Sequence, residues 1–212
     1  MTDHARLKAP LQARSQRTLD KIVQAVEGLL EVRSFDEIAV ADIIRRARCS
    51  TGSFYARFPT KDAVLPYLYA RYDADLRPRV AAKLARVDWS RMTLRETVDL
   101  LVSGTVDMYV ERRHLLRAVA LFARAHPDAL GEDIPRRRQG VHDMPARLIS
   151  RFTSEITHPD AMDAARVGFF IVAAAARDKL LFDAPHGTTT RLTTNQLKAH
   201  LARSLFAYLT CG

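Results

Sequence analysis

Hydroxyl-bearing and cationic side chains gather in one short stretch near the N-terminal end of the sequence. In chain order, these residues are Ser50, Thr51, Ser53, Tyr55, Arg57 and Lys61. Such groups donate hydrogen bonds to base edges and to sugar–phosphate oxygens. At the start of a helix, backbone N–H groups and the positive end of the dipole favour phosphate as well, and Gly52 allows a close backbone approach. The stretch therefore indicates binding of a polyanion rather than bond-making chemistry.

Two short predicted helices position these side chains. Apolar residues at helical spacing predict a helix over residues 40–47, and a break at 48–50 follows it. Ser50 is the natural N-cap of the next helix, which is very short. Phe54 and Phe58 lie one turn apart on its inner side and can pack it against the preceding helix. We therefore predict a helix-turn-helix, with the hydroxyl-bearing side of the second helix facing outward.

The rest of the chain also predicts helices, and no segment shows the alternation typical of strands. A first helix holds the apolar run from Leu19 to Leu30 and is expected to end near Arg33. A fourth is expected from Lys61, with a kink at Pro66. Longer helices are expected at 93–112, 114–126, 133–155 (kinked or divided at Pro145), 159–183 and 192–210, and a loop at 186–194. The predicted fold class is all-α.

Composition narrows the classes of function. The 33 basic and 24 acidic residues give a net charge of +9, which favours polyanions but is spread evenly along the chain. The chain has 2 cysteines and no Gly-rich phosphate loop, nucleophile elbow or zinc-protease motif, so we expect no catalysis, metal or cofactor. The N-terminus is polar, and the longest apolar run, 167–176, is too short to span a bilayer. These features predict a cytoplasmic protein with no membrane partner.

One continuous stretch, from Thr18 to Leu65, carries a family resemblance. Its marker residues are Phe35, Asp36, Ile43, Ala47, Ser50, Gly52, Phe54, Tyr55, Phe58, Lys61 and Asp62. It resembles the N-terminal DNA-binding domain of the TetR family of transcriptional regulators. The resemblance implies a homodimer that binds double-stranded operator DNA and responds to a small-molecule effector. The remaining two-thirds of the chain is similar to that family only in length and helical character.

The resemblance also implies roles for individual residues. Thr51 and Ser53 would contact base edges, Tyr55, Arg57 and Lys61 would bind phosphates, and Val40 and Ala41 would place a backbone N–H near the DNA backbone. The full set of expected DNA-binding residues is Arg14, Arg17, Val40, Ala41, Arg48, Ser50, Thr51, Gly52, Ser53, Tyr55, Arg57 and Lys61.

The stretch departs from the family pattern at four places, one of which is Arg57, where a His is common. Ala39 stands where a capping Thr is common, and Ser34 where a Gly is frequent. Arg48 and Cys49 replace the usual Gly-Val of the turn, so a residue with a Cβ is expected in the left-handed conformation. Arg48 either adds a DNA contact or is simply exposed. Cys49 is either a small buried apolar residue or a redox switch.

The C-terminal two-thirds predicts dimerisation. Residues 166–177 and the final helix are apolar over more than one side, which favours cover by a second copy over a fully buried helix in a monomer. The expected interface residues are Gly168, Val172, Ala176, Leu201, Leu205 and Phe206. A dimer would also set two recognition helices about 34 Å apart, the spacing of successive major-groove faces.

An effector cavity is expected among the helices from about 93 to 183. Its expected lining residues are Met108, Tyr109, Leu121, Phe122, Met144, Phe152, Phe169 and Phe170, although residues of these types at helical spacing more often fill a core. The set favours a largely apolar or aromatic effector.

Taken together, the sequence predicts a basic flexible arm (1–16), a helix-turn-helix DNA-binding domain (17–62) and an effector-binding and dimerisation domain (63–212). The favoured function is a DNA-binding transcriptional regulator, a repressor on a palindromic operator. Two alternatives stay open: a non-enzymatic helical small-molecule binder, and an architectural DNA-binding protein without a ligand response.

Overall fold

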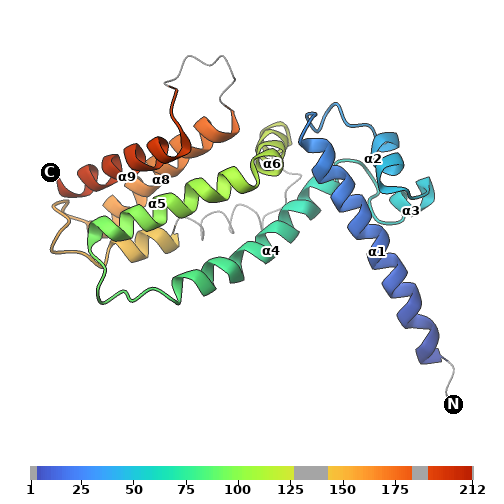
Figure 1. Ribbon diagram of the computed structural model, residues 1–212, viewed down its shortest axis with the longest axis horizontal. Helices are drawn as coiled ribbons and strands as arrows, with labels where there is room; N and C mark the ends of the chain where they lie inside the picture. Colours follow the sequence, from blue (N-terminus) through green and yellow to red (C-terminus); the bar gives the residue numbers. More distant parts are fainter. Residues whose placement is uncertain (1–3, 127–142, 183–190, 212) are drawn as a thin grey trace. The chain divides into compact units, whose positions relative to one another are not determined.

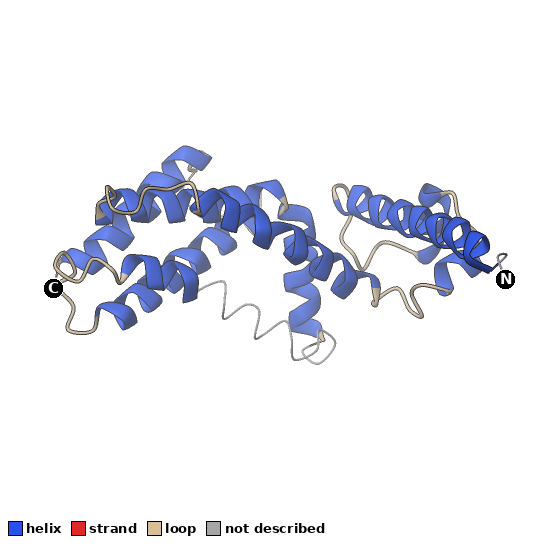
Figure 2. Ribbon diagram, turned by 90° about the horizontal axis from the view of Figure 1, so that it is seen from below, coloured by secondary structure: helices blue, strands red, loops and turns tan. Residues whose placement is uncertain are grey.

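The computed structural model describes residues 4–126, 143–182 and 191–211, with side chains from residue 15 onward. Helices are the only regular elements in these ranges, which confirms the all-α prediction (Figures 1 and 2). They are α1 (His4–Leu30), α2 (Val40–Ala47), α3 (Thr51–Tyr55), α4 (Val64–Leu84), α5 (Leu94–Glu111), α6 (Arg113–Ala125), α8 (Ala161–Leu181) and α9 (Thr194–Thr210), with a further helical stretch at 143–149.

The chain divides into two compact units. The first contains α1, α2, α3, α4 as far as Arg79, and Ala118–Ala125 of α6. The second begins at Val80 and contains α5, the start of α6, α8 and α9. The first unit thus extends beyond the domain boundary expected at residue 62 and includes a segment from the middle of the chain.

The core of the first unit is built from one side of α1 and the inner sides of the short helices. Ile22 and Val26 of α1, Ile43 of α2 and Phe54 of α3 are all 0% exposed. Phe54 and Phe58 lie with their ring centroids 5.8 Å apart, both buried, as the sequence predicts. Burying a side chain of this size stabilises the fold by roughly 1.5–3 kcal/mol. These contacts hold the five-residue helix α3 in place although it is too short to be stable alone.

The helix-turn-helix has the caps and the turn that the sequence predicts. Ser50 caps α3, because its Oγ accepts a hydrogen bond from the backbone N–H of Ser53 at 3.2 Å. Ala39 precedes α2 without a side-chain cap; in its place the Asp42 carboxylate accepts from the Ala39 N–H at 3.4 Å. Arg48 ends α2 in the left-handed region at φ 51°, which confirms the expectation for this turn.

Four expectations for α1 and α4 need correction. Residues 1–16, expected as a separate arm, belong to α1 from His4 onward, and α1 ends at Leu30 rather than near Arg33. Helix α4 begins at Val64 rather than at Lys61. Pro66 then lies in the first turn, where a helix N–H has no intrahelical partner, so the expected kink at Pro66 is wrong.

The second unit packs α5, α8 and α9 side by side (Figure 1). Leu94 and Val98 of α5, Ile149, Phe169 of α8 and Leu205 of α9 meet in its core, each at most 2% exposed. Of the expected helix 133–155, residues 133–142 lie outside the described residues, as do residues 186–190 of the expected loop.

Candidate nucleic-acid interface

Helix α3 presents its hydroxyl-bearing side to solvent. Thr51 and Gly52 are exposed, and Tyr55 keeps 50% of its surface exposed while its ring packs edge-on against Phe54 at 5.3 Å. Buried Phe54 therefore fixes the direction in which exposed Tyr55 points. Among the described residues, a Cβ added at Gly52 would meet no atom within 4 Å.

Ser50 and Ser53 form a local hydrogen-bonded pair at the start of α3. Ser50 Oγ accepts from the Ser53 N–H and donates to Ser53 Oγ, at 3.2 and 2.9 Å. Ser53 is half-buried, whereas Thr51, between them, is exposed. Of the two residues expected to contact base edges, Thr51 is thus the more accessible, and Ser53 also stabilises the helix start.

The Lys61 ammonium is bound to the loop that precedes α2. Its Nζ donates to the carbonyl oxygens of Phe35 and Asp36 at 3.0 and 3.3 Å and lies 4.7 Å from the centre of the Phe35 ring. An ammonium has three N–H donors, so one remains for an external acceptor. Lys61 therefore ties the loop before α2 to the segment before α4, and its charge stays near the surface.

Arg57, expected to bind phosphate, makes internal contacts. Its guanidinium donates to the Ser53 carbonyl at 2.6 Å and to the backbone and side-chain oxygens of Ser15 at 3.0 and 3.1 Å. Arg57 thus ties the end of α3 to α1. These contacts hold α3 in position against α1 and use acceptors within the chain.

The other expected DNA-binding residues lie on α1, α2 and the turn. Val40 opens α2, and Ala41 beside it is exposed. Arg17 and Arg48 are exposed as well. The side chain of Arg14 lies outside the described residues.

Asp42 organises the charges around α2. Its carboxylate binds Arg33 at 2.9 Å, from the loop after α1, and also binds Arg45 one turn along α2. The hydrogen bond from Arg33 holds the pKa of Asp42 below its ordinary value of 3.8. Sequence reasoning missed this role, although an acidic residue at the third position of a helix with an uncapped start is a recognisable signal.

A second ion pair joins α1 to α4. Arg71 donates to Asp20 at 2.7 Å. This hydrogen bond lowers the pKa of Asp20 and raises the pKa of Arg71. Together with the Arg57–Ser15 contacts, it fixes α1 against the helices that follow.

Phe122 of α6 is part of the first unit. It is 6% exposed and meets Phe35 edge-on, with ring centroids 6.2 Å apart. Phe122, which is expected to line the effector cavity, thus packs in the first unit. The aromatic spacing of α6 gives no indication of which unit its side chains join.

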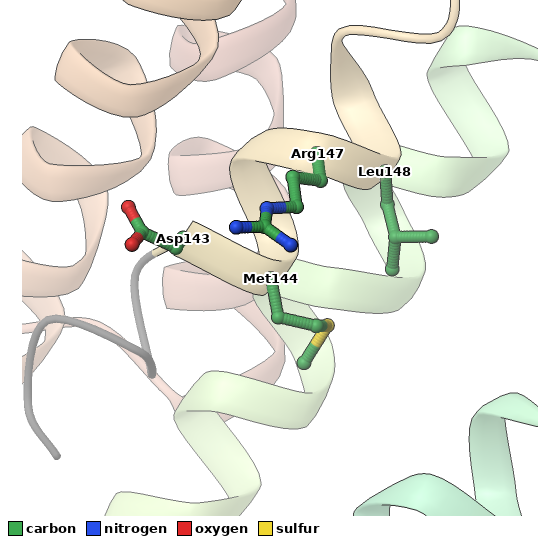
Figure 3. A pocket seen from close by; sticks show the side chains of 4 residues that line it. All are labelled: Asp143, Met144, Arg147 and Leu148. Atoms are coloured by element: carbon green, nitrogen blue, oxygen red, sulfur yellow. The ribbon is translucent and has the colours of Figure 1, made fainter.

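The second unit has a hollow of about 390 Å³ beside the helical stretch 143–149. It is lined by Asp143, Met144, Arg147 and Leu148 (Figure 3). Arg166 of α8 lies 3.5 Å from the Asp143 carboxylate. Met144 is the one member of the expected effector set that lines this hollow.

The remaining expected cavity residues lie elsewhere. Phe169 is 2% exposed in the core, with Phe152 packed against that core, whereas Leu121 and Phe170 are 42% and 56% exposed. Met108 and Tyr109 are half-buried on α5. The eight residues thus lie at different depths, and an effector cavity lined by them stays a prediction.

Most of the expected dimer residues pack inside the chain. Val172, Ala176 and Leu205 are at most 4% exposed, and Gly168 lets α9 approach α8 so closely that an added Cβ would lie 2.7 Å from Leu205. Leu201 and Phe206 are half-buried. The α8/α9 face that remains exposed carries other apolar residues: Val167, Phe170, Ile171 and Tyr208.

No helix among the described residues is long and apolar enough to span a bilayer.

Comparisons with known proteins agree with this architecture. The model of the tetR family of bacterial regulatory proteins matches residues 22–68, the helix-turn-helix segment. The HTH-type transcriptional regulator YwcC of Bacillus subtilis (strain 168) is 38% identical over 61 residues, which are 29% of this chain and 27% of that protein. The match thus spans about a quarter of that relative, whose own function is uncharacterised.

Solved structures share the fold over most of their length. A TetR-family transcriptional regulator from Mesorhizobium loti MAFF303099 superposes with a TM-score of 0.63 at 18% identity, covering 92% of this chain and 96% of that one. A TetR family transcriptional regulator from Pseudomonas syringae pv. tomato str. DC3000 superposes with a TM-score of 0.54 at 20% identity, covering 90% of this chain and 93% of that one. The similarity in fold therefore includes both units.

Proposed function

Because the chain belongs, by its N-terminal domain, to the TetR family of transcriptional regulators, we propose that it binds a specific operator through α3 and represses transcription. The observation that carries this proposal is the exposed edge of Thr51, Gly52 and Tyr55 on a helix anchored by buried Phe54. Hydroxyl groups at this edge can bond base edges in the major groove, while Tyr55 and Lys61 bond phosphates. The role is binding and requires no catalytic group.

A homodimer is part of the proposal. Phe170 and Ile171 of α8 are 56% and 53% exposed, and Tyr208 of α9 is 40% exposed. Exposed large apolar side chains on two adjacent helices favour a symmetric contact with a second copy, in which the same face meets itself. The proposed interface is thus the exposed side of α8 and α9, while Gly168 and Leu205 pack inside each chain.

Effector response is the third part. The hollow beside 143–149 combines the apolar Met144 and Leu148 with the charged Asp143 and Arg147. It favours a small, largely apolar ligand with one polar group. Helix α6 belongs to both units, and its Phe122 packs on Phe35, which in turn supports Lys61. A ligand that shifts α6 would therefore change how Lys61 is held.

The proposal is tested by selecting sequences from a random duplex pool with the purified full chain and measuring stoichiometry on the selected duplex. We expect an inverted repeat bound by two protomers, with affinity well above that for random duplex. Tight binding without sequence preference would instead indicate an architectural protein. Absence of duplex binding would leave a helical small-molecule binder.

A further inference from the structure

A hollow in the first unit lies between α1 and the end of α2, beside the turn that leads into α3. Its volume is about 400 Å³, and it is lined by Lys21, Gln24, Ala25, Arg46, Ala47 and Arg48. Three of the six are cations, Gln24 adds amide donors, and none is acidic. A concave surface of this composition attracts an anion of small size.

These cations differ from four other arginines of the first unit, each of which pairs with an aspartate. Arg33 and Arg45 share Asp42, Arg71 pairs with Asp20, and Arg77 pairs with Asp73. In contrast, Lys21, Arg46 and Arg48 form no ion pair with the described residues. Like charges around one hollow repel each other, so this arrangement is unfavourable until an anion enters it.

The backbone is adapted to place two of the cations. Arg48 adopts φ 51°, a conformation that costs about 1–2 kcal/mol for a residue with a Cβ and almost nothing for glycine. Gly28 of α1 lies under Arg46: a Cβ there would lie 2.5 Å from Arg46 Nη2. The chain thus has arginine where glycine would be relaxed, and glycine beside the Arg46 guanidinium, and both arginines line the hollow.

We propose that this hollow is a phosphate-binding site, formed by Lys21, Gln24, Arg46 and Arg48 and separate from the exposed edge of α3. Planar guanidinium groups bind phosphate oxygens through paired hydrogen bonds, and three cations around one hollow suit a multiply charged anion better than an apolar ligand. The phosphate belongs either to the DNA backbone next to the bases that α3 reads, or to a free phosphate-bearing molecule. The first source rests on the proposed function, and the second does not.

The test uses the full chain and two variants that preserve folding. Arg48→Gly removes one cation and relieves the left-handed strain. Gly28→Ala keeps all charges but displaces the Arg46 guanidinium, and alanine is favourable in a helix. Arg86→Gln removes an exposed arginine in the second unit and is the charge-matched control. Melting temperatures at or above the wild-type value show that both hollow variants are folded.

Two readouts separate the sources. For a DNA phosphate, the slope of log K against log salt on duplex DNA falls by about 0.9 in Arg48→Gly and in Gly28→Ala, and stays unchanged in Arg86→Gln. For a free phosphate, that slope is unchanged, but inorganic phosphate raises the melting temperature of the wild type more than of either variant, relative to chloride at equal ionic strength.

Phosphate stabilises proteins generally by exclusion from their surface, and this effect is equal in all variants, so only the difference counts. Equal slopes together with equal phosphate effects in wild type and variants would overturn the proposal. A wild type that binds no duplex would contradict the proposed function, and the inorganic phosphate measurement would still decide the site.

Discussion

Single residues around the helix-turn-helix serve the fold and the interface at the same time. Lys61 donates to two backbone carbonyls, and Arg57 donates to Ser15 on α1. The sequence predicts their proximity to DNA from their spacing after α3, but it cannot show which acceptors within the chain compete for their donors. Thr51 and Tyr55, by contrast, lie exposed as their position opposite Phe54 predicts.

Arg48 gives the first prediction at this scale. Replacing it with glycine relieves a left-handed residue that carries a Cβ, so we expect Arg48→Gly to raise the free energy of unfolding by about 1 kcal/mol. Urea unfolding of wild type and variant at pH 7 measures the difference. Arg48→Ala is the control, because it removes the same side chain and keeps the strain; equal stability of the two variants would contradict the explanation.

At the scale of elements, the contacts between α1 and the short helices set the stability of the first unit. Asp42 holds Arg33 after α1 and Arg45 on α2, and its pKa is lowered chiefly by the Arg33 hydrogen bond. A carboxylate with a lowered folded-state pKa contributes stability above its unfolded value, 3.8, and loses it as the pH falls through the folded value.

We therefore expect Asp42→Asn to have a lower free energy of unfolding than wild type at pH 7, and we expect this difference to shrink as the pH drops below 3.8. Chemical unfolding at a series of pH values from 7 to about 2 measures the difference. A difference in the free energy of unfolding that stays constant at every pH would mean that the Asp42 charge does not contribute to stability. The substitution would then act through the shape of the side chain alone.

Helix α6 gives the second prediction among elements. Phe122→Ala removes a buried ring that packs on Phe35, and such a change costs about 3 kcal/mol when the cavity does not close. We expect thermal unfolding to show this loss of stability in the first unit. We also expect weaker duplex binding, because the Phe35 ring lies against the Lys61 ammonium. Leu121 lies on the same helix but is 42% exposed, so Leu121→Ala is the control. It should change neither the thermal unfolding nor the duplex binding.

Helix positions and types were largely predictable from apolar spacing, because each helix buries one side at a period near 3.6 residues. The start of α4 was not predictable from the sequence, because Thr60 and Lys61 have the residue types of a helix start. The chain makes one more turn before the helix begins at Val64. The side of α8 that faces solvent was also misjudged. Its residues are apolar all round, so spacing alone cannot distinguish Val172, in the core, from Ile171, outside.

At the scale of the whole molecule, the exposed apolar side of α8 is the feature that a single chain leaves uncovered. Ile171→Glu places a charge where the proposed dimer buries this side chain, so we expect a shift from dimer to monomer and a loss of operator affinity of more than tenfold. Sedimentation at micromolar protein measures the first effect.

Val32→Glu adds the same charge at a residue that is 75% exposed in the first unit, and it should leave the dimer intact. If Ile171→Glu sediments like wild type, the two copies do not meet through α8. If both variants become monomeric, added charge and not the interface explains the change.

The measurement that tests the account most directly is sequence selection from a random duplex pool with wild type and with Thr51→Val, which replaces an exposed hydroxyl by a methyl group of similar volume. We predict that both enrich an inverted repeat and have similar salt slopes, but differ in preference at one or two positions of each half-site, because Thr51 contacts base edges. Identical preferences, or no enrichment with wild type, would contradict the claim that the exposed edge of α3 recognises DNA sequence.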